Sequence, residues 1–155
     1  AKEVANAAYA YYLGTVLFYL DRDNDAVAAL QRALIADVNH QEAALRIALI
    51  RQAQYETDRN RAALRAAVDY YRIAESIDTI PTDAAPRYAD ALVAMGQWEE
   101  AQAMLQRLSD TVPGAAKHLA EAIASLQPAI DHAAQVEQNA RDRAAQEPES
   151  VDALL

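Results

Sequence analysis

Three aspartates at alternate positions are the closest approach to a metal site in this 155-residue chain. Asp21, Asp23 and Asp25 match the first ligand positions of a calcium-binding loop. Such a loop also needs a glycine at its sixth position and a bidentate glutamate at its twelfth. Those two positions hold Ala26 and Arg32. We therefore predict that the aspartates turn the chain and cap the helix that follows.

The three histidines form no catalytic or metal-binding arrangement. His40, His118 and His132 are too far apart in sequence to share one helical turn, and only Glu121 lies on the same predicted face as His118. Two such ligands do not make a metal site. The chain has no cysteine, which excludes disulfides, thiolate zinc sites and cysteine nucleophiles. Phosphate-binding glycine loops and serine-nucleophile motifs are also absent from the sequence. We expect no catalytic residue, no metal, no cofactor and no enzymatic activity.

The charge and hydropathy patterns exclude two classes of partner. A net charge of −9 repels phosphate backbones, so we expect no nucleic-acid partner. The stretch from Val4 to Leu20 carries no charge and is at the short limit for a membrane span. Because it contains Asn6, Gly14 and four tyrosines, we predict a helix with one buried face and one binding face, and no membrane insertion. The absence of cysteine fits a soluble protein of either the cytoplasm or an exported compartment, and the localisation stays open.

The elements that must position any binding residues are helices. Three glycines and five prolines are too few for many tight turns, and apolar residues recur at helical spacing. We predict a single domain over residues 1–146, followed by a flexible acidic tail over residues 147–155. Within the domain, we expect helical hairpins over about residues 3–38, 40–79 and 82–112. Pro128 is predicted to break or kink the chain within a capping region at about residues 115–146.

Small residues recur at a fixed spacing in the first and third hairpins. Ala26 follows Gly14 by twelve positions, and Ala101 follows Ala89 by the same interval. In the middle hairpin the corresponding residues are Ala48 and Ala67, and this interval holds seven further residues. Seven residues are close to two helical turns. We therefore predict that both helices of the middle hairpin are longer, with their tip at about residues 55–61.

This spacing resembles the tetratricopeptide repeat (TPR), a helix-turn-helix unit of 34 residues. Gly96, Gln97 and Trp98 open the second helix of the third unit, and Pro113 ends it. The resemblance covers about residues 7–114. It implies an all-α fold, a right-handed α-solenoid of about three hairpins plus a C-terminal capping helix or two.

In TPR proteins the first helix of each hairpin lines a concave groove. By that resemblance, we expect the groove to be lined by Tyr11, Thr15, Phe18, Tyr19, Leu45, Leu49, Gln52, Asp90 and Val93. One branch of the family clamps a chaperone carboxylate with Lys, Asn and Arg. Those places here hold Tyr11, Thr15, Leu45 and Leu49, so we do not expect that clamp. Tyrosines suit recognition because they give large, rigid contact areas with polar tips. They could equally be core residues or cover a terminal repeat.

Two functions follow from these expectations. The first is a non-catalytic adaptor or scaffold module that binds a peptide or helix of another protein in the groove. The alternative is a self-association module, a homo-oligomer whose groove is filled by its own C-terminal helix or by another copy.

Overall fold

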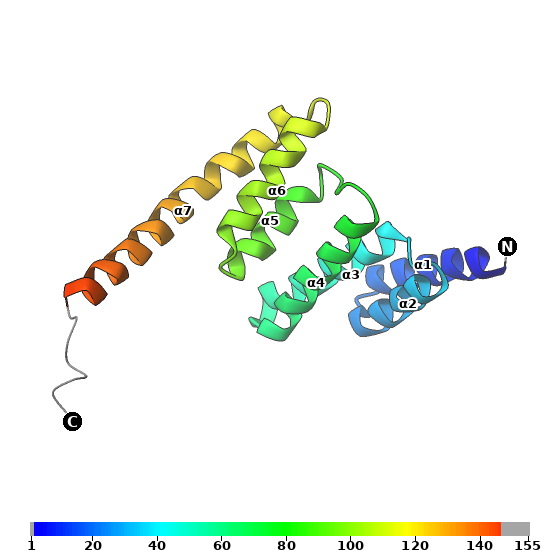
Figure 1. Cartoon of the computed structure of the whole chain (residues 1–155). Helices are drawn as coiled ribbons and strands as arrows, with labels where there is room; N and C mark the ends of the chain where they lie inside the picture. The colour runs from blue at the N-terminus through cyan, green and yellow to red at the C-terminus, as the bar shows by residue number, and fades with distance from the viewer. Residues whose placement is uncertain (1, 147–155) are drawn as a thin grey trace, which may run out of the picture.

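The computed structural model describes residues 2–146, which fold into helices without a strand, as the all-α prediction required (Figure 1). The predicted tail at residues 147–155 lies outside the described residues. No helix of the described part has the length and hydropathy that a bilayer span needs. The helices are α1 (Lys2–Tyr19), α2 (Asp23–Ala36), α3 (Gln41–Asp58), α4 (Arg61–Ile77), α5 (Ala85–Ala94), α6 (Trp98–Thr111) and α7 (Ala115–Gln146).

The helices pack as a linear series of antiparallel pairs. Helix α1 packs on α2, α3 on α4 and α5 on α6, each of these pairs also contacts the next one along the chain, and α6 packs more extensively on α7 than on α5. Helix α7 packs on α6, so the first hairpin and α7 occupy opposite ends of the molecule (Figure 1). Each hairpin therefore meets only its neighbours, which is the arrangement of a helical solenoid.

Small residues let the two helices of a hairpin approach closely. A Cβ atom on Gly14 would lie 2.6 Å from the Leu30 Cγ atom and 3.0 Å from the carbonyl oxygen of Ala26. Gly14 therefore lies directly against Ala26 and Leu30 across the first hairpin. The corresponding alanines of the other two hairpins are all buried, namely Ala48, Ala67, Ala89 and Ala101.

The prediction of a longer middle hairpin is confirmed. Helix α3 continues ten residues beyond Ala48, whereas α1 and α5 continue five residues beyond Gly14 and Ala89. Helices α3 and α4 have 18 and 17 residues, and α5 and α6 have 10 and 14. The tip is a two-residue connection in which Arg59 takes a left-handed φ of 58° and the Asn60 side chain caps α4.

The turn into α2 differs from the prediction that aspartates cap this helix. The residue before α2 is Arg22, and no side chain makes a capping hydrogen bond there. Asp23 and Asp25 lie inside the first helical turn instead, where a negative charge complements the helix dipole. Arg22 Nε donates to Asp25 Oδ2 at 2.8 Å, so the Asp25 carboxylate is hydrogen-bonded within the first turn of α2.

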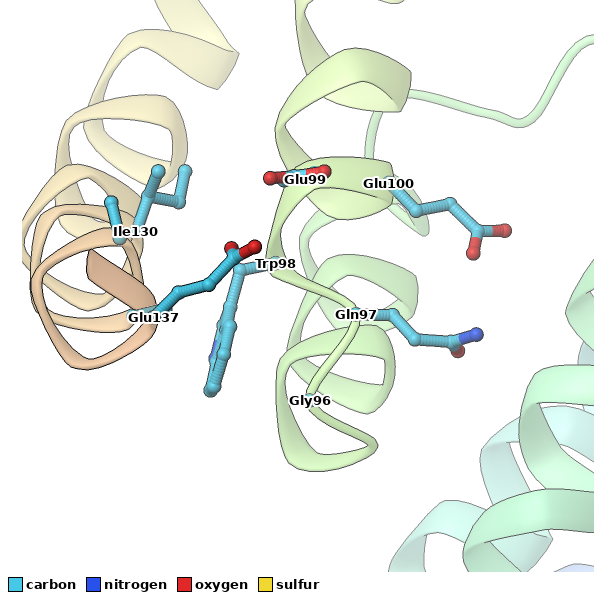
Figure 2. Close-up of a pocket in the computed structure, with 9 residues that line it drawn as sticks. Gly96, Gln97, Trp98, Glu99, Glu100, Ile130 and Glu137 are labelled. Atoms are coloured by element: carbon cyan, nitrogen blue, oxygen red, sulfur yellow. The ribbon is translucent and has the colours of Figure 1, made fainter. Parts of the chain in front are cut away.

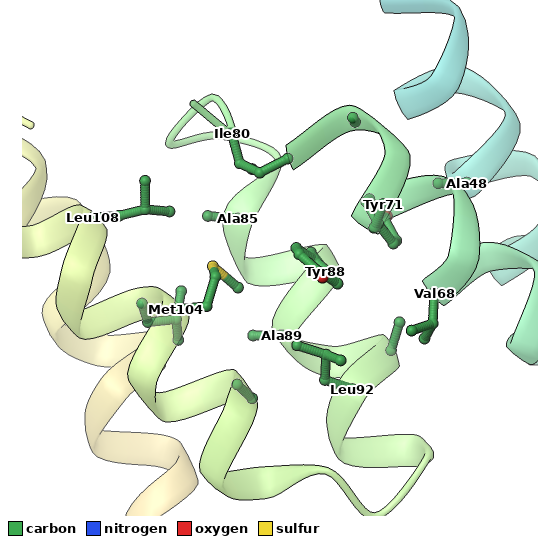
Figure 3. Packing of buried hydrophobic residues seen from close by; sticks show 14 of the residues in the cluster. Ala48, Val68, Tyr71, Ile80, Ala85, Tyr88, Ala89, Leu92, Met104 and Leu108 are labelled. Carbon is green, nitrogen blue, oxygen red and sulfur yellow. The ribbon is translucent and has the colours of Figure 1, made fainter. Parts of the chain in front are cut away.

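Two stacked tyrosines join the second and third hairpins (Figure 3). The rings of Tyr71 on α4 and Tyr88 on α5 have centroids 4.8 Å apart and an interplanar angle of 18°. Burial raises the pKa of both hydroxyls, so both are protonated at neutral pH. The Tyr71 hydroxyl donates to Gln52 Oε1 at 2.8 Å, and the Tyr88 hydroxyl donates to Glu75 at 3.2 Å. Each buried hydroxyl thus has a hydrogen-bond partner.

Pro128, predicted to break or kink the chain, does not break it, because α7 runs through it as one helix of 32 residues. Proline removes one backbone donor and leaves the carbonyl of Ala124 without its helical partner. Ala124 and Pro128 are both exposed, so water can satisfy that carbonyl. Leu126 and Ile130, on either side of the proline, pack in the core that α6 and α7 share. These contacts keep the two halves of α7 in line.

Candidate binding face

The first helices of the three hairpins present one continuous row of side chains. Helices α1 and α3 are in contact, and Arg46 of α3 donates to the Tyr11 hydroxyl of α1 at 3.3 Å. Helices α3 and α5 are joined by an ion pair between Glu56 and Arg87, 3.1 Å apart. We call the side chains of α1, α3 and α5 on this side the first-helix face.

The α1 end of the first-helix face combines aromatic rings with a fixed cation. The Tyr11 ring lies 4.8 Å from the His40 ring and 6.0 Å from the Arg46 guanidinium. Burial by itself lowers the pKa of Arg46, but hydrogen bonds to Tyr11 and Tyr19 outweigh it and raise the pKa. Arg46 therefore keeps its charge beside the Tyr11 hydroxyl, to which it donates.

The α5 end of the first-helix face is a cluster of two acids and one arginine. Burial raises the pKa of Asp90, nearby Arg87 opposes that rise, and the negative charge of Glu56 adds to it. Arg87 and Glu56 form the exposed ion pair described above. The ends of the face thus differ: one carries aromatic rings and a cation, the other a nearly balanced set of charges.

The residues predicted for the groove have unequal access to a partner. Gln52 is only 3% exposed and accepts the hydrogen bond from Tyr71, and Leu45 is 9% exposed within the core. These two side chains offer almost no area to a ligand. Tyr19 and Asp90 are exposed, and the partly buried residues are Tyr11, Thr15, Phe18, Leu49 and Val93.

Sequence reasoning missed the two arginines that hold the first-helix face together. Arg46 and Arg87 each stand two residues before a small crossing residue, Ala48 or Ala89. The position is therefore the same in consecutive hairpins, and Tyr12 takes that place in the first hairpin. This repeated register was the signal that could have identified them.

A cavity of about 450 Å³ lies between the start of α6 and the C-terminal half of α7. Trp98 and Glu137 approach each other from the two helices, and Ile130 forms part of the wall (Figure 2). The rim is acidic, but Glu100 points away (Figure 2) and binds Arg72 of α4 at 2.9 Å. The walls of this cavity suit an apolar side chain or a cation, which would lie against the Trp98 indole ring.

The C-terminal helix does not cover the first-helix face. Helix α7 packs along α6, and its remaining helix contacts are minor. The form of the self-association alternative in which the chain's own last helix fills the groove therefore does not match this structure.

Comparisons with known proteins identify the fold. No protein-family model matches the chain, and a comparison with curated proteins finds no match. Three solved structures align with TM-scores of 0.62. The first TPR of Spaghetti (RPAP3), bound to the HSP90 peptide SRMEEVD, is 17% identical, and the alignment covers 83% of this chain and 98% of that one.

The second structure is the Yersinia enterocolitica type III secretion chaperone SycD in complex with a peptide of the translocator YopD. It is 19% identical, with 80% of this chain and 91% of that chain covered. The third is MamA, also 19% identical, with 92% and 81% covered. The hairpin series and these alignments show that the chain has the fold of a TPR-like helical repeat.

Proposed function

We propose that this chain is a non-catalytic interaction module that binds a segment of a partner protein against its first-helix face. The observation that carries the proposal is the alignment of α1, α3 and α5 by Arg46 and Arg87, described above. It leaves the side chains of Tyr11, Leu49 and Val93 partly accessible along one face. Two structures with this fold, those of RPAP3 and SycD, were determined with a peptide bound.

The chemistry of the face favours a ligand of mixed character. Leu49 offers an apolar contact at the middle of the face, flanked by the tyrosine and arginine group and by the charged cluster. An extended segment or a helix with one apolar anchor fits this order, since apolar anchors supply affinity and the polar flanks set orientation. The contact set we propose therefore omits Leu45 and Gln52 and adds Arg46.

Selection from a displayed library of random peptides tests this function. We expect the immobilised chain to enrich a peptide family with an apolar anchor. Leu49→Asp should weaken binding of the selected peptides by at least about tenfold, because it places a charge at the anchor site. Tyr19→Asp, at an exposed position, should also weaken binding without disturbing the core.

Ile35→Asp is the matched control, because Ile35 is 81% exposed on α2, away from the first-helix face. It should leave peptide affinity unchanged, and circular dichroism verifies that each variant is folded. The proposal is overturned if no peptide family is enriched, or if folded Leu49→Asp and Tyr19→Asp proteins bind the selected peptides as the original chain does.

A further inference from the structure

We propose that the outward face of α1 pairs with the same face of a second copy, giving a closed two-fold dimer. Four large side chains form this face, which we call the α1 stripe: Tyr9, Tyr12, Val16 and Leu20. Their spacing of three, four and four residues places them in one row along the helix. They are between 54% and 71% exposed, although Val16 and Leu20 are aliphatic side chains of a kind usually found inside proteins.

The repeat register relates two residues of the α1 stripe, Tyr9 and Val16, to the side of α3 that packs on the first hairpin. Tyr9 and Val16 stand five residues before and two residues after Gly14. The same places around Ala48 hold Ala43 and Ile50, which are fully buried. Helix α3 packs against the first hairpin, so this side of a first helix is the side that meets the hairpin before it. In α1 the corresponding side chains, Tyr9 and Val16, are 71% and 54% exposed among the described residues.

The size and charge of the α1 stripe fit a second copy of the chain. The exposed area of its four side chains is roughly 500 Å², more than half of the ~800 Å² that each partner contributes to a standard interface. The net charge of the chain is −9, so two copies repel each other over most of their surfaces. From Val4 to Leu20 the sequence is uncharged, which makes the α1 stripe a surface where copies can meet without opposing like charges.

The outer side of α7 does not favour a head-to-tail contact with the α1 stripe of another copy. The outer side of α7 carries polar and charged residues, including Lys117, Glu121, Asp131 and Gln135, all exposed. An apolar stripe gains little by packing on such a surface. Pairing of the α1 stripe with itself buries both apolar faces, and a self-complementary contact of this kind closes as a dimer. The two α1 helices then run antiparallel, with Tyr12 and Val16 near the two-fold axis.

Sedimentation equilibrium of the whole chain tests the dimer directly. We expect a mass of twice 16.9 kDa for the original chain and of one copy for the double variant Tyr12→Asp with Val16→Asp. Ile35→Asp, at an apolar position on α2 that is 81% exposed, should remain dimeric. A monomeric original chain overturns the proposal, as does a folded double variant that stays dimeric. Dissociation by Ile35→Asp would overturn it in favour of an α2 interface.

A cross-link gives an independent test, because the chain contains no cysteine. Val16→Cys introduces a single thiol near the predicted two-fold axis, within disulfide reach of its copy. Under mild oxidation we expect a covalent dimer on a non-reducing gel. Ile35→Cys should form this product far more slowly, at the rate of random collision. Equal rates for the two variants would contradict the arrangement.

Discussion

The two ends of this solenoid differ in the polarity of the side chains that they expose. A stack of hairpins ends in two faces that no neighbour covers, and terminal elements of such stacks normally carry a polar outer side. Helix α7 follows that rule, because Leu119 and Leu126 face α6 while its outer side is polar. Helix α1 does not, because Tyr9 and Val16 are exposed. This difference in the exposed side chains is the observation on which the proposed pairing through the α1 stripe rests.

The largest change in stability is expected when α7 loses a buried side chain from its contact with α6. Leu119 is fully buried, so Leu119→Ala should lower the free energy of unfolding by about 2–5 kcal/mol, from lost burial and the cavity left behind. Urea unfolding followed by circular dichroism measures the change. Ala120→Ser, at an exposed neighbouring position, is the control and should have little effect. Equal stability of the two variants would mean that α7 is not a docked cap.

Gly14→Ala tests how closely α1 packs against α2. Helix propensity alone predicts that this change stabilises α1 by about 1 kcal/mol. The structure predicts the opposite sign, because the added Cβ would lie 2.6 Å from Leu30 Cγ, and overpacking costs about 1–3 kcal/mol. The thermal unfolding midpoint should fall. A rise would show that α1 and α2 are less closely packed than the structure has them.

The smallest effect is expected between the ends, at Asp90. Its pKa in the folded chain is raised above the ordinary value, chiefly by burial. The folded state therefore holds this proton more tightly than the unfolded state does. The associated stability is present at pH below the ordinary value and is lost as pH rises through the folded pKa. As the pH rises from acidic to neutral, the unfolding midpoint of Asp90→Asn should rise relative to that of the original chain. A difference that does not change with pH would contradict this reading.

The fold could be predicted from sequence because its determinants are local and repeated. The interval between Gly14 and Ala26 recurs between Ala89 and Ala101, and close helix approach needs small residues at those places. The seven extra residues between Ala48 and Ala67 fell almost entirely within helices, since whole turns keep the buried faces in phase.

The rest depended on contacts between residues far apart in the chain. Gln52 was expected at the ligand surface, but Tyr71, nineteen positions later, binds its amide in the core. The ion pair of Glu56 with Arg87 spans 31 positions, and helical spacing within one element does not reveal it. Pro128 has a strong local preference to end a helix, and packing on α6 overrides that preference.

Amide hydrogen exchange at two protein concentrations tests the contrast between the ends most directly. If α1 pairs with a second copy, raising the concentration from about 1 to about 100 µM should slow exchange in α1, because association stabilises the paired state. Exchange in α7 should stay the same at both concentrations. Protection that grows in α7 instead, or exchange that is independent of concentration in both helices, would contradict the proposed pairing through the α1 stripe.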